Sequence, residues 1–250
     1  MNVLQEYLTQ HLGVPVEISI QVSSNYEDGP KSVIDGRVDF VRFGPASYVL
    51  TKDAEPNVAL LAADSVGGKA QFYGIIAVPE NSNIVSISRL RGRTFAFGDE
   101  RSTIGRYLSQ LYLFQHGIRA QDLGGFAYLG RHDIVGTAVS NGQYDAGALK
   151  EGTFKKLVKK GHKLRALARF PNVTHAWVAR PNLDDNLRQA LSAALLAITD
   201  KQALEAFGRD GFLDVSDSDY DIIRQAISNN DQFFSSTDAM ANTSATAAEQ

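Results

Sequence analysis

The chain has 250 residues, of which 44% are hydrophobic and 21% are charged, as expected for a soluble globular protein of one or two domains. A formal net charge of −3 and a pI near 6.0 argue against nucleic acid as a partner. Cysteine is absent, which excludes disulfides and thiolate metal sites, and no apolar run is long enough to span a membrane.

The first part of the chain predicts an amphipathic helix followed by short strands and helices. Residues 1–12 place Leu4, Leu8 and Leu12 on one helical stripe. The chain opens on this helix without a signal-peptide pattern, so we expect the natural protein to begin further upstream. Alternating or continuous apolar residues predict strands at 14–22, 38–43, 58–63 and 72–78. Gly and Pro mark the boundaries of predicted helices at 31–35 and from Pro45.

The second part alternates strands and helices, which favours largely parallel sheets covered by helices on both faces. Its predicted strands lie at 94–97, 126–129, 145–149, 164–168 and 176–179. Its predicted helices lie at 86–90, 104–115, 134–140, 153–159, 184–198, 201–207 and 217–228. The polar, small-residue tail from Ser235 is expected to be disordered.

Residues 94–108 predict a buried strand, a tight turn and the start of a helix. Phe95 and Phe97 alternate with small residues, and Gly98 begins the turn. Ser102 and Thr103 then stand at a helix start, where backbone N–H groups lack intrahelical acceptors and suit an anion. From these residues alone, the simpler interpretation is that Ser102 only caps its own helix.

Five segments in order resemble the phosphonate-type substrate-binding proteins of ABC transporters. They are residues 36–48, 73–78, 90–98 and 102–105, and His132-Asp133 with residues 141–148. The resemblance covers about residues 1 to 230. It implies an α/β, two-lobed periplasmic-binding fold of the second type, with mainly parallel sheets and a phosphonate, phosphite or phosphate in a cleft between the lobes.

The resemblance also implies the ligand-binding residues. The family's Ser-Thr-Ser run matches Ser102-Thr103-Ile104, so one hydroxyl is missing, and backbone N–H groups of Ile104 and Gly105 remain. The other predicted ligand-binding residues are polar side chains of several segments: Tyr48, Tyr73, His132, Asp145, Glu151 and His175. Asp145 could instead cap a turn, and the tyrosines could be core aromatics. His175 stands where aminophosphonate binders have an aspartate, which argues against an amino group on the ligand.

The two apolar strands at 72–78 and 176–179 are expected to cross between lobes. Lobe 1 is then predicted at 1–76 and 177–234, lobe 2 at 77–176, and a tail at 235–250. The family begins with a strand that this sequence lacks, and that strand would pair with residues 14–22 and 38–43. Without it we expect a longer natural chain or a marginal first lobe.

The favoured hypothesis is a monomeric extracytoplasmic solute-binding protein, periplasmic or membrane-anchored, that delivers a phosphorus oxyanion to the membrane subunits of an ABC importer. The alternative is a sensor domain of a signalling receptor with the same fold. Five histidines show no metal-ligand spacing, and neither a Gly-x-Ser-x-Gly elbow nor a Walker loop is present. We therefore expect no catalysis, no cofactor and no metal.

Overall fold

The computed structural model describes residues 2–23 and 26–235, which form two compact units. Unit 1 contains the residues up to Phe72 together with Asn172–Arg224. Unit 2 contains Tyr73–Pro171 and the residues that follow Arg224. Each unit therefore consists of separate chain segments.

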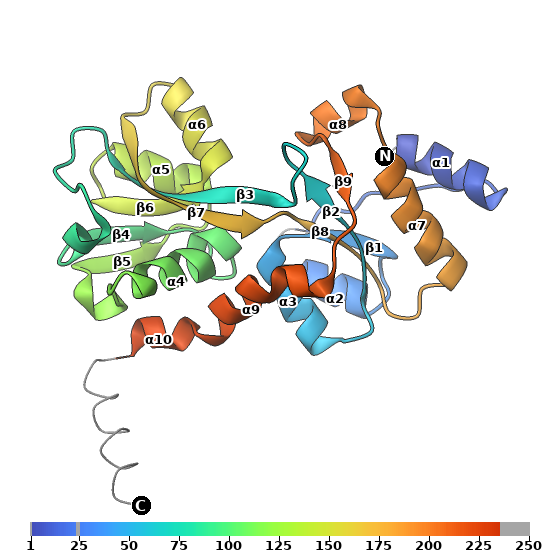
Figure 1. Cartoon of the computed structure of the whole chain (residues 1–250), viewed down its shortest axis with the longest axis horizontal. Helices are drawn as coiled ribbons and strands as arrows, with labels where there is room; N and C mark the ends of the chain where they lie inside the picture. The colour runs from blue at the N-terminus through green and yellow to red at the C-terminus, as the bar shows by residue number, and fades with distance from the viewer. Residues whose placement is uncertain (1, 24–25, 236–250) are drawn as a thin grey trace, which may run out of the picture. The chain divides into compact units, whose positions relative to one another are not determined.

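Unit 2 is built on a five-stranded sheet in the order β5-β4-β6-β3-β7 (Figure 1). The strands are β3 Gln71–Pro79, β4 Thr94–Phe97, β5 Gly125–Tyr128, β6 Ala146–Lys150 and β7 Leu164–Val173. Strand β4 pairs in parallel with β5 and β6, whereas β3 pairs antiparallel with β6. The sheet is thus mixed, and the carboxyl ends of β4, β5 and β6 meet at one edge.

Helices cover both faces of this sheet (Figure 1). They are η1 Ile87–Leu90, η2 Thr103–Tyr107, α4 Leu108–Gln115, η3 Ala120–Asp122, α5 His132–Ser140, α6 Glu151–Lys159 and α10 Asn230–Phe234. On one face, Val135 of α5 and Leu157 of α6 pack with Ile75 and Leu149 of the sheet. Helix α10 packs against α4. The ring of its Phe233 lies 5.9 Å from that of Phe97. This packing explains why α10 belongs to unit 2 although the sequence predicts lobe 1 for it.

Unit 1 has a four-stranded sheet in the order β1-β8-β2-β9. The strands are β1 Phe40–Phe43, β2 Ala59–Ser65, β8 Ala176–Ala179 and β9 Gly211–Leu213. All the pairings within it are antiparallel among the described residues. The predicted parallel arrangement is therefore wrong here, because β8 returns from the second chain segment and lies between β1 and β2.

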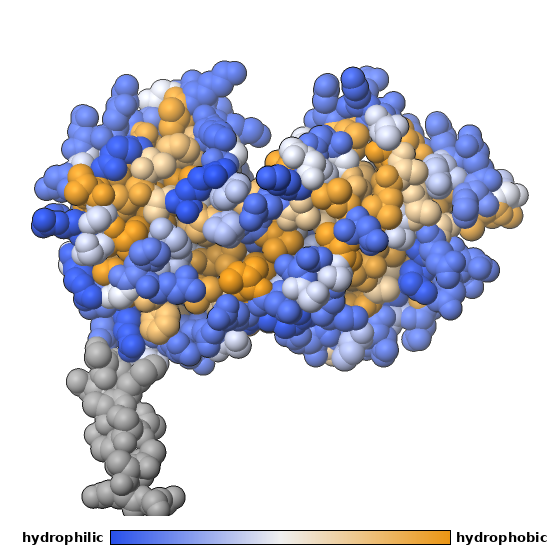
Figure 2. Space-filling view, viewed as in Figure 1, coloured by the Kyte–Doolittle hydropathy of each residue, from blue (hydrophilic) through white to orange (hydrophobic). Residues whose placement is uncertain are grey.

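Unit 1 has a second set of helices. They are α1 Asn2–Leu12, α2 Asp28–Ile34, α3 Pro45–Ala54, α7 Asp185–Ala197, α8 Lys201–Phe207, η4 Asp217–Tyr220 and α9 Asp221–Ser228, in which the boundary between the units falls. Leu4 and Leu8 of α1 pack with Leu191 of α7 and Trp177 of the sheet, as their helical stripe predicts. Figure 2 shows apolar surface over α7 and β9 in this unit.

A buried carboxylate ties the strands of unit 1 together. Asp64 of β2 is fully buried and accepts hydrogen bonds from Arg42 of β1, from Trp177 Nε1 of β8 at 3.0 Å and from Arg209 Nε at 2.7 Å. Burial alone would raise the pKa of Asp64, but the two arginines hold it below its usual value. The carboxylate is therefore charged at neutral pH.

Residues 14–22 do not form the predicted strand. None of the described strands pairs with them; instead the backbone N–H groups of Val16 and Ile18 donate to Thr9 Oγ1 and Gln5 Oε1 of α1, at 3.1 and 3.0 Å. Val22 is 90% exposed. The alternating pattern thus does not become a strand, because an extended segment needs a neighbouring strand for its backbone hydrogen bonds.

The boundaries between units differ from the predicted lobe boundaries. They fall after Phe72 and after Pro171, within β3 and β7, rather than after residues 76 and 176. The second crossing is made by β7, which extends well beyond the predicted end at residue 168, and β8 lies wholly in unit 1. Of the predicted disordered tail, all but Ser235 falls outside the described residues.

Candidate functional site

The carboxyl end of β4 is joined to the following helix by close backbone packing. Gly98 N–H donates to the Gly105 carbonyl at 2.8 Å. A Cβ on Gly98 would lie 2.9 Å from Gly105 Cα, and a Cβ on Gly105 would lie 2.8 Å from Gly98 Cα. Both positions therefore need glycine. This contact brings the helix start directly against the end of the central strand.

The helix start is buried and irregular. Ser102 and Thr103 are 4% and 7% exposed. Ser102 is the N-cap, and its Oγ accepts the Gly105 N–H at 3.0 Å. The first turn, Thr103–Tyr107, is a π-helix, and the predicted α-helix begins only at Leu108. The Gly105 N–H, which the resemblance assigns to the ligand, is thus already bonded to Ser102 Oγ. The Ile104 N–H precedes the first intrahelical bonds and is a donor that this terminus offers.

His132 lies at the same edge of the sheet, after β5 and in the first turn of α5. Its Cε1 lies 3.7 Å from the place that a Cβ on Gly98 would occupy. Burial, and then the positive charge of Lys150, lower the pKa of His132 to about 3, so the ring is neutral at physiological pH. One ring nitrogen hydrogen-bonds the backbone of Ala148, and Nδ1 is buried without a partner among the described residues.

The end of β6 completes this edge. Lys150 is the last residue of the strand, and its Cα pairs with that of Gly74 in β3. A Cβ on Gly74 would approach Ile104 Cγ2 to 3.1 Å. Three strand ends thus bring together residues that are far apart in sequence. We call Ser102, Thr103, Ile104, Gly105 and His132 the anion cradle.

Tyr73 and Glu151 lie in a charged cluster beside this edge. The guanidinium of Arg169 lies over the Tyr73 ring, 3.1 Å from its centroid. Glu151 accepts hydrogen bonds from Arg169 Nε at 3.1 Å and Nη2 at 3.4 Å, and Lys155 Nζ lies 3.4 Å from it. Glu151 is therefore not a bare carboxylate, and sequence reasoning gave no indication of the Arg169 contact.

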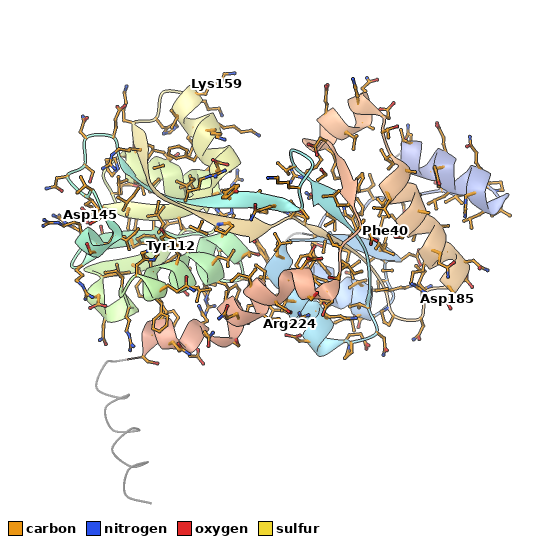
Figure 3. The ribbon with its side chains drawn as sticks, viewed as in Figure 1. Phe40, Tyr112, Asp145, Lys159, Asp185 and Arg224 are labelled. Carbon is orange, nitrogen blue, oxygen red and sulfur yellow. The ribbon has the colours of Figure 1, made fainter. Side chains whose placement is uncertain are left out.

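Asp145 is not brought to the anion cradle. Its carboxylate accepts hydrogen bonds from Thr94 N–H at 2.8 Å and Thr94 Oγ1 at 2.9 Å, and Arg93 lies 3.8 Å from it. Thr94 begins β4, whereas the cradle follows the end of that strand, and Figure 3 labels Asp145 at this amino end. Asp145 therefore joins the start of β4 to the segment before β6, which neither the ligand-binding nor the turn-capping interpretation predicted, and we leave it out of the site.

Tyr48 and His175 belong to unit 1. Tyr48 is fully buried and donates its hydroxyl to Asp217 at 2.6 Å. Burial and this carboxylate raise the pKa of Tyr48, so the hydroxyl keeps its proton. Asp217 also accepts two hydrogen bonds from Arg224, which Figure 3 labels on α9. Binding through the Tyr48 hydroxyl would require it to leave a strong acceptor.

His175 stacks on Phe72, with ring centroids 5.8 Å apart, and its Nδ1 lies 3.6 Å from Asp64. Nearby in sequence, Asn172 is 2% exposed, and both polar atoms of its carboxamide lack a partner among the described residues. A buried amide of this kind is costly unless a water or a solute binds it. Sequence reasoning did not single out Asn172, since an asparagine in an extended segment carries no signal of its own.

Among the described residues, no helix has the length and apolar character needed to cross a membrane. In the same part of the chain, no group of three or more His, Asp or Glu side chains is arranged to hold a metal ion.

Solved structures define the class of protein. XAC2383 from Xanthomonas citri, bound to chloride ion, has a TM-score of 0.76 at 22% identity and covers 93% of this chain and 92% of its own. PhnD1 from Prochlorococcus marinus, in complex with methylphosphonate, has a TM-score of 0.75 at 26% identity, with 90% and 89% covered. The fold is the two-lobed periplasmic-binding fold of the second type, so the predicted fold class is confirmed, and the molecule is a solute-binding protein.

The family follows from the sequence comparison. Residues 1–220 match the family of ABC transporter, phosphonate, periplasmic substrate-binding proteins, and the chain belongs to this family. A curated relative is the probable ABC transporter phosphite-binding protein PhnD1 of Prochlorococcus marinus, 26% identical over 246 residues, which are 90% of this chain and 82% of that protein. The protein is thus an extracytoplasmic substrate-binding component of an ABC transporter rather than an enzyme, as predicted.

Proposed function

We propose that the anion cradle binds a small phosphorus oxyanion, a phosphonate, phosphite or phosphate, for import. The observation that carries this proposal is the buried helix start at Ser102 and Thr103 near the buried Nδ1 of His132, which has no partner within residues 2–23 and 26–235. Relatives named for phosphite binding, phosphate import and a methylphosphonate complex support the same ligand class.

The helix start supplies donors suited to an oxyanion. Its N–H groups carry partial positive charge, and two hydroxyls stand beside them. Ser102 Oγ already accepts one N–H, which leaves its own proton for the ligand. Ile104 replaces the hydroxyl that the family has at the third position, so we expect one oxygen of the ligand to receive fewer hydrogen bonds.

His132 supplies an acceptor in this proposal. In a neutral imidazole one nitrogen donates and the other accepts. The ring nitrogen Nε2 donates to the backbone carbonyl of Ala148. In the neutral ring Nδ1 is therefore the acceptor. A monoprotonated phosphonate or phosphate can donate its P–OH proton to Nδ1, whereas sulfate has no proton to donate. We therefore expect sulfate to bind poorly.

The ligand is further proposed to lack an ammonium group, because His175 stands where aminophosphonate binders have an aspartate. Asp64, which lies 3.6 Å from His175, is held by Arg42 and Arg209 and so cannot serve as the counter-ion of an aminophosphonate. Tyr48, Tyr73 and His175 stay proposed contributors to binding. Of these, Tyr73 has its ring held by Arg169.

Calorimetry on the whole chain tests the proposal with methylphosphonate, phosphite, phosphate, aminoethylphosphonate and sulfate. We expect binding of one or more of the first three, and weak binding of the last two. The double variant Ser102→Ala, Thr103→Val should lose most of the affinity, whereas Ser88→Ala, at an exposed position, should not. Unchanged affinity of the double variant contradicts the cradle, and no binding of any of the first three contradicts the ligand class.

We further propose that the protein acts as a monomer and that it is either free in the periplasm or anchored to the membrane on its extracytoplasmic side. Light scattering in solution and fractionation of cells that express the natural gene test these two statements. A stable dimer contradicts the first, and recovery of the protein only in the cytoplasmic fraction contradicts the second.

A further inference from the structure

We propose that Lys150 is an additional ligand-binding residue, which supplies the positive charge that the anion cradle itself lacks. This inference deepens the proposed function and rests on it. The cradle residues are two hydroxyls, backbone N–H groups and a neutral imidazole, so none of them carries a formal charge. An oxyanion buried there would need a cation close by, because burial of an uncompensated charge is costly.

The strand pairing places Lys150 at the correct edge of the sheet. Strand β6 runs parallel to β4, so its last residue lies at the edge where Ser102 and Thr103 follow β4. Lys150 pairs with Gly74, and the position that a Cβ on Gly74 would take lies 3.1 Å from Ile104 Cγ2 of the cradle. Lys150 is therefore separated from the cradle by only one neighbouring strand residue.

The alternation of side chains places Lys150 on the same face as the helix start. Leu149 packs with Val135 and Leu157 on the face covered by α5 and α6. Successive side chains of a strand point to opposite faces, so Lys150 projects to the other face, which η2 covers. At the end of the strand its long side chain can reach both Ile104 and the ring of His132.

The electrostatics agree with this placement. The charge of Lys150 reaches the His132 ring, since it contributes to the low pKa of that histidine. The next residue, Glu151, has its carboxylate held by Arg169 and Lys155. Lys150, Lys155 and Arg169 together outnumber the one carboxylate, so the end of β6 has a net positive charge. This charge favours an anion over a neutral or cationic solute.

The test compares charge removal at Lys150 with the same change at a distant lysine. Lys150→Met keeps an apolar stem and removes the charge, Lys150→Arg keeps the charge, and Lys159→Met is the matched control on the exposed end of α6, where Figure 3 labels Lys159. Calorimetry with methylphosphonate and phosphite should show that Lys150→Met weakens binding about ten- to a hundredfold. Lys150→Arg should recover most of the affinity, and Lys159→Met should stay within about twofold of the unchanged protein.

Each outcome has a distinct meaning. If the unchanged protein binds these anions and Lys150→Met binds them equally well, the inference about Lys150 is overturned while the proposed function stands. If the unchanged protein binds neither, the proposed function fails, and the inference fails with it. A crystal structure with methylphosphonate decides the matter even if Lys150→Met does not fold, because Nζ beyond hydrogen-bond distance of every ligand oxygen overturns the inference.

Discussion

Replacement of His132 by glutamine should change the pH dependence of stability in a defined direction. The pKa of His132 is lowered to about 3 in the folded protein, from an ordinary value of 6.5 in the unfolded chain. Above pH 6.5 both states hold the neutral ring, and the group contributes nothing. As the pH falls below 6.5 the unfolded chain binds a proton that the folded protein does not, so the free energy of unfolding falls until about pH 3.

The magnitude follows from the two pKa values. Each pH unit inside this interval costs about 1.4 kcal/mol, so at about pH 4.5 the loss attributable to His132 is about 2 to 3 kcal/mol. Urea unfolding of the unchanged protein and of His132→Gln, at about pH 7.5 and about pH 4.5, measures it. Other titrating groups contribute to both proteins and cancel in the difference. Equal losses of stability in the two proteins on acidification would refute a buried neutral imidazole.

Three further predictions concern stability. Gly105→Ala should lower the free energy of unfolding by about 1 to 3 kcal/mol because its Cβ would lie 2.8 Å from Gly98 Cα; Gly152→Ala, where a Cβ meets nothing within 4 Å, is the control, and equal effects in urea unfolding contradict the close packing. Asn172→Leu should raise the thermal midpoint of the ligand-free protein, because at similar volume it removes a buried carboxamide that has no partner in the described part of the chain; a fall in the midpoint contradicts this. Asp64→Asn should cost about 3 to 5 kcal/mol in the same unfolding assay, because it leaves two arginines facing an uncharged group, and a loss below about 1 kcal/mol would show that the carboxylate is dispensable.

Much of the fold could be predicted because its signals are local. Strand β4 has the predicted bounds, since Phe95 and Phe97 alternate with small residues before a glycine. Helix α1 has the predicted apolar stripe. Strand β9 was not predicted because it has only three residues, too few to show an alternating pattern. Helix α10 was not predicted because it is stabilised by packing on Phe97, which is far away in sequence.

The site was predictable only in part, for a related reason. The sequence identifies the helix start at Ser102 and Thr103 through turn and cap chemistry, which is local. Which strand ends meet there depends on the order of strands in the sheet, and β6 lies beside β4 although their segments are far apart. The place of Lys150, and that of Arg169 over Tyr73, follow from that order and could not be read from neighbouring residues.

The place of β8 has a consequence for how the chain folds. Strands β1 and β2 are made early in synthesis, yet each pairs with β8, which lies more than a hundred residues later in the chain. Unit 2, by contrast, takes its whole sheet from one nearly continuous segment. During translation unit 2 can therefore fold first. Strands β1 and β2 lack the backbone hydrogen-bond partners that β8 supplies until that strand has been synthesised. A chaperone that shields those strands should raise the yield of native protein more than one that acts on the central segment.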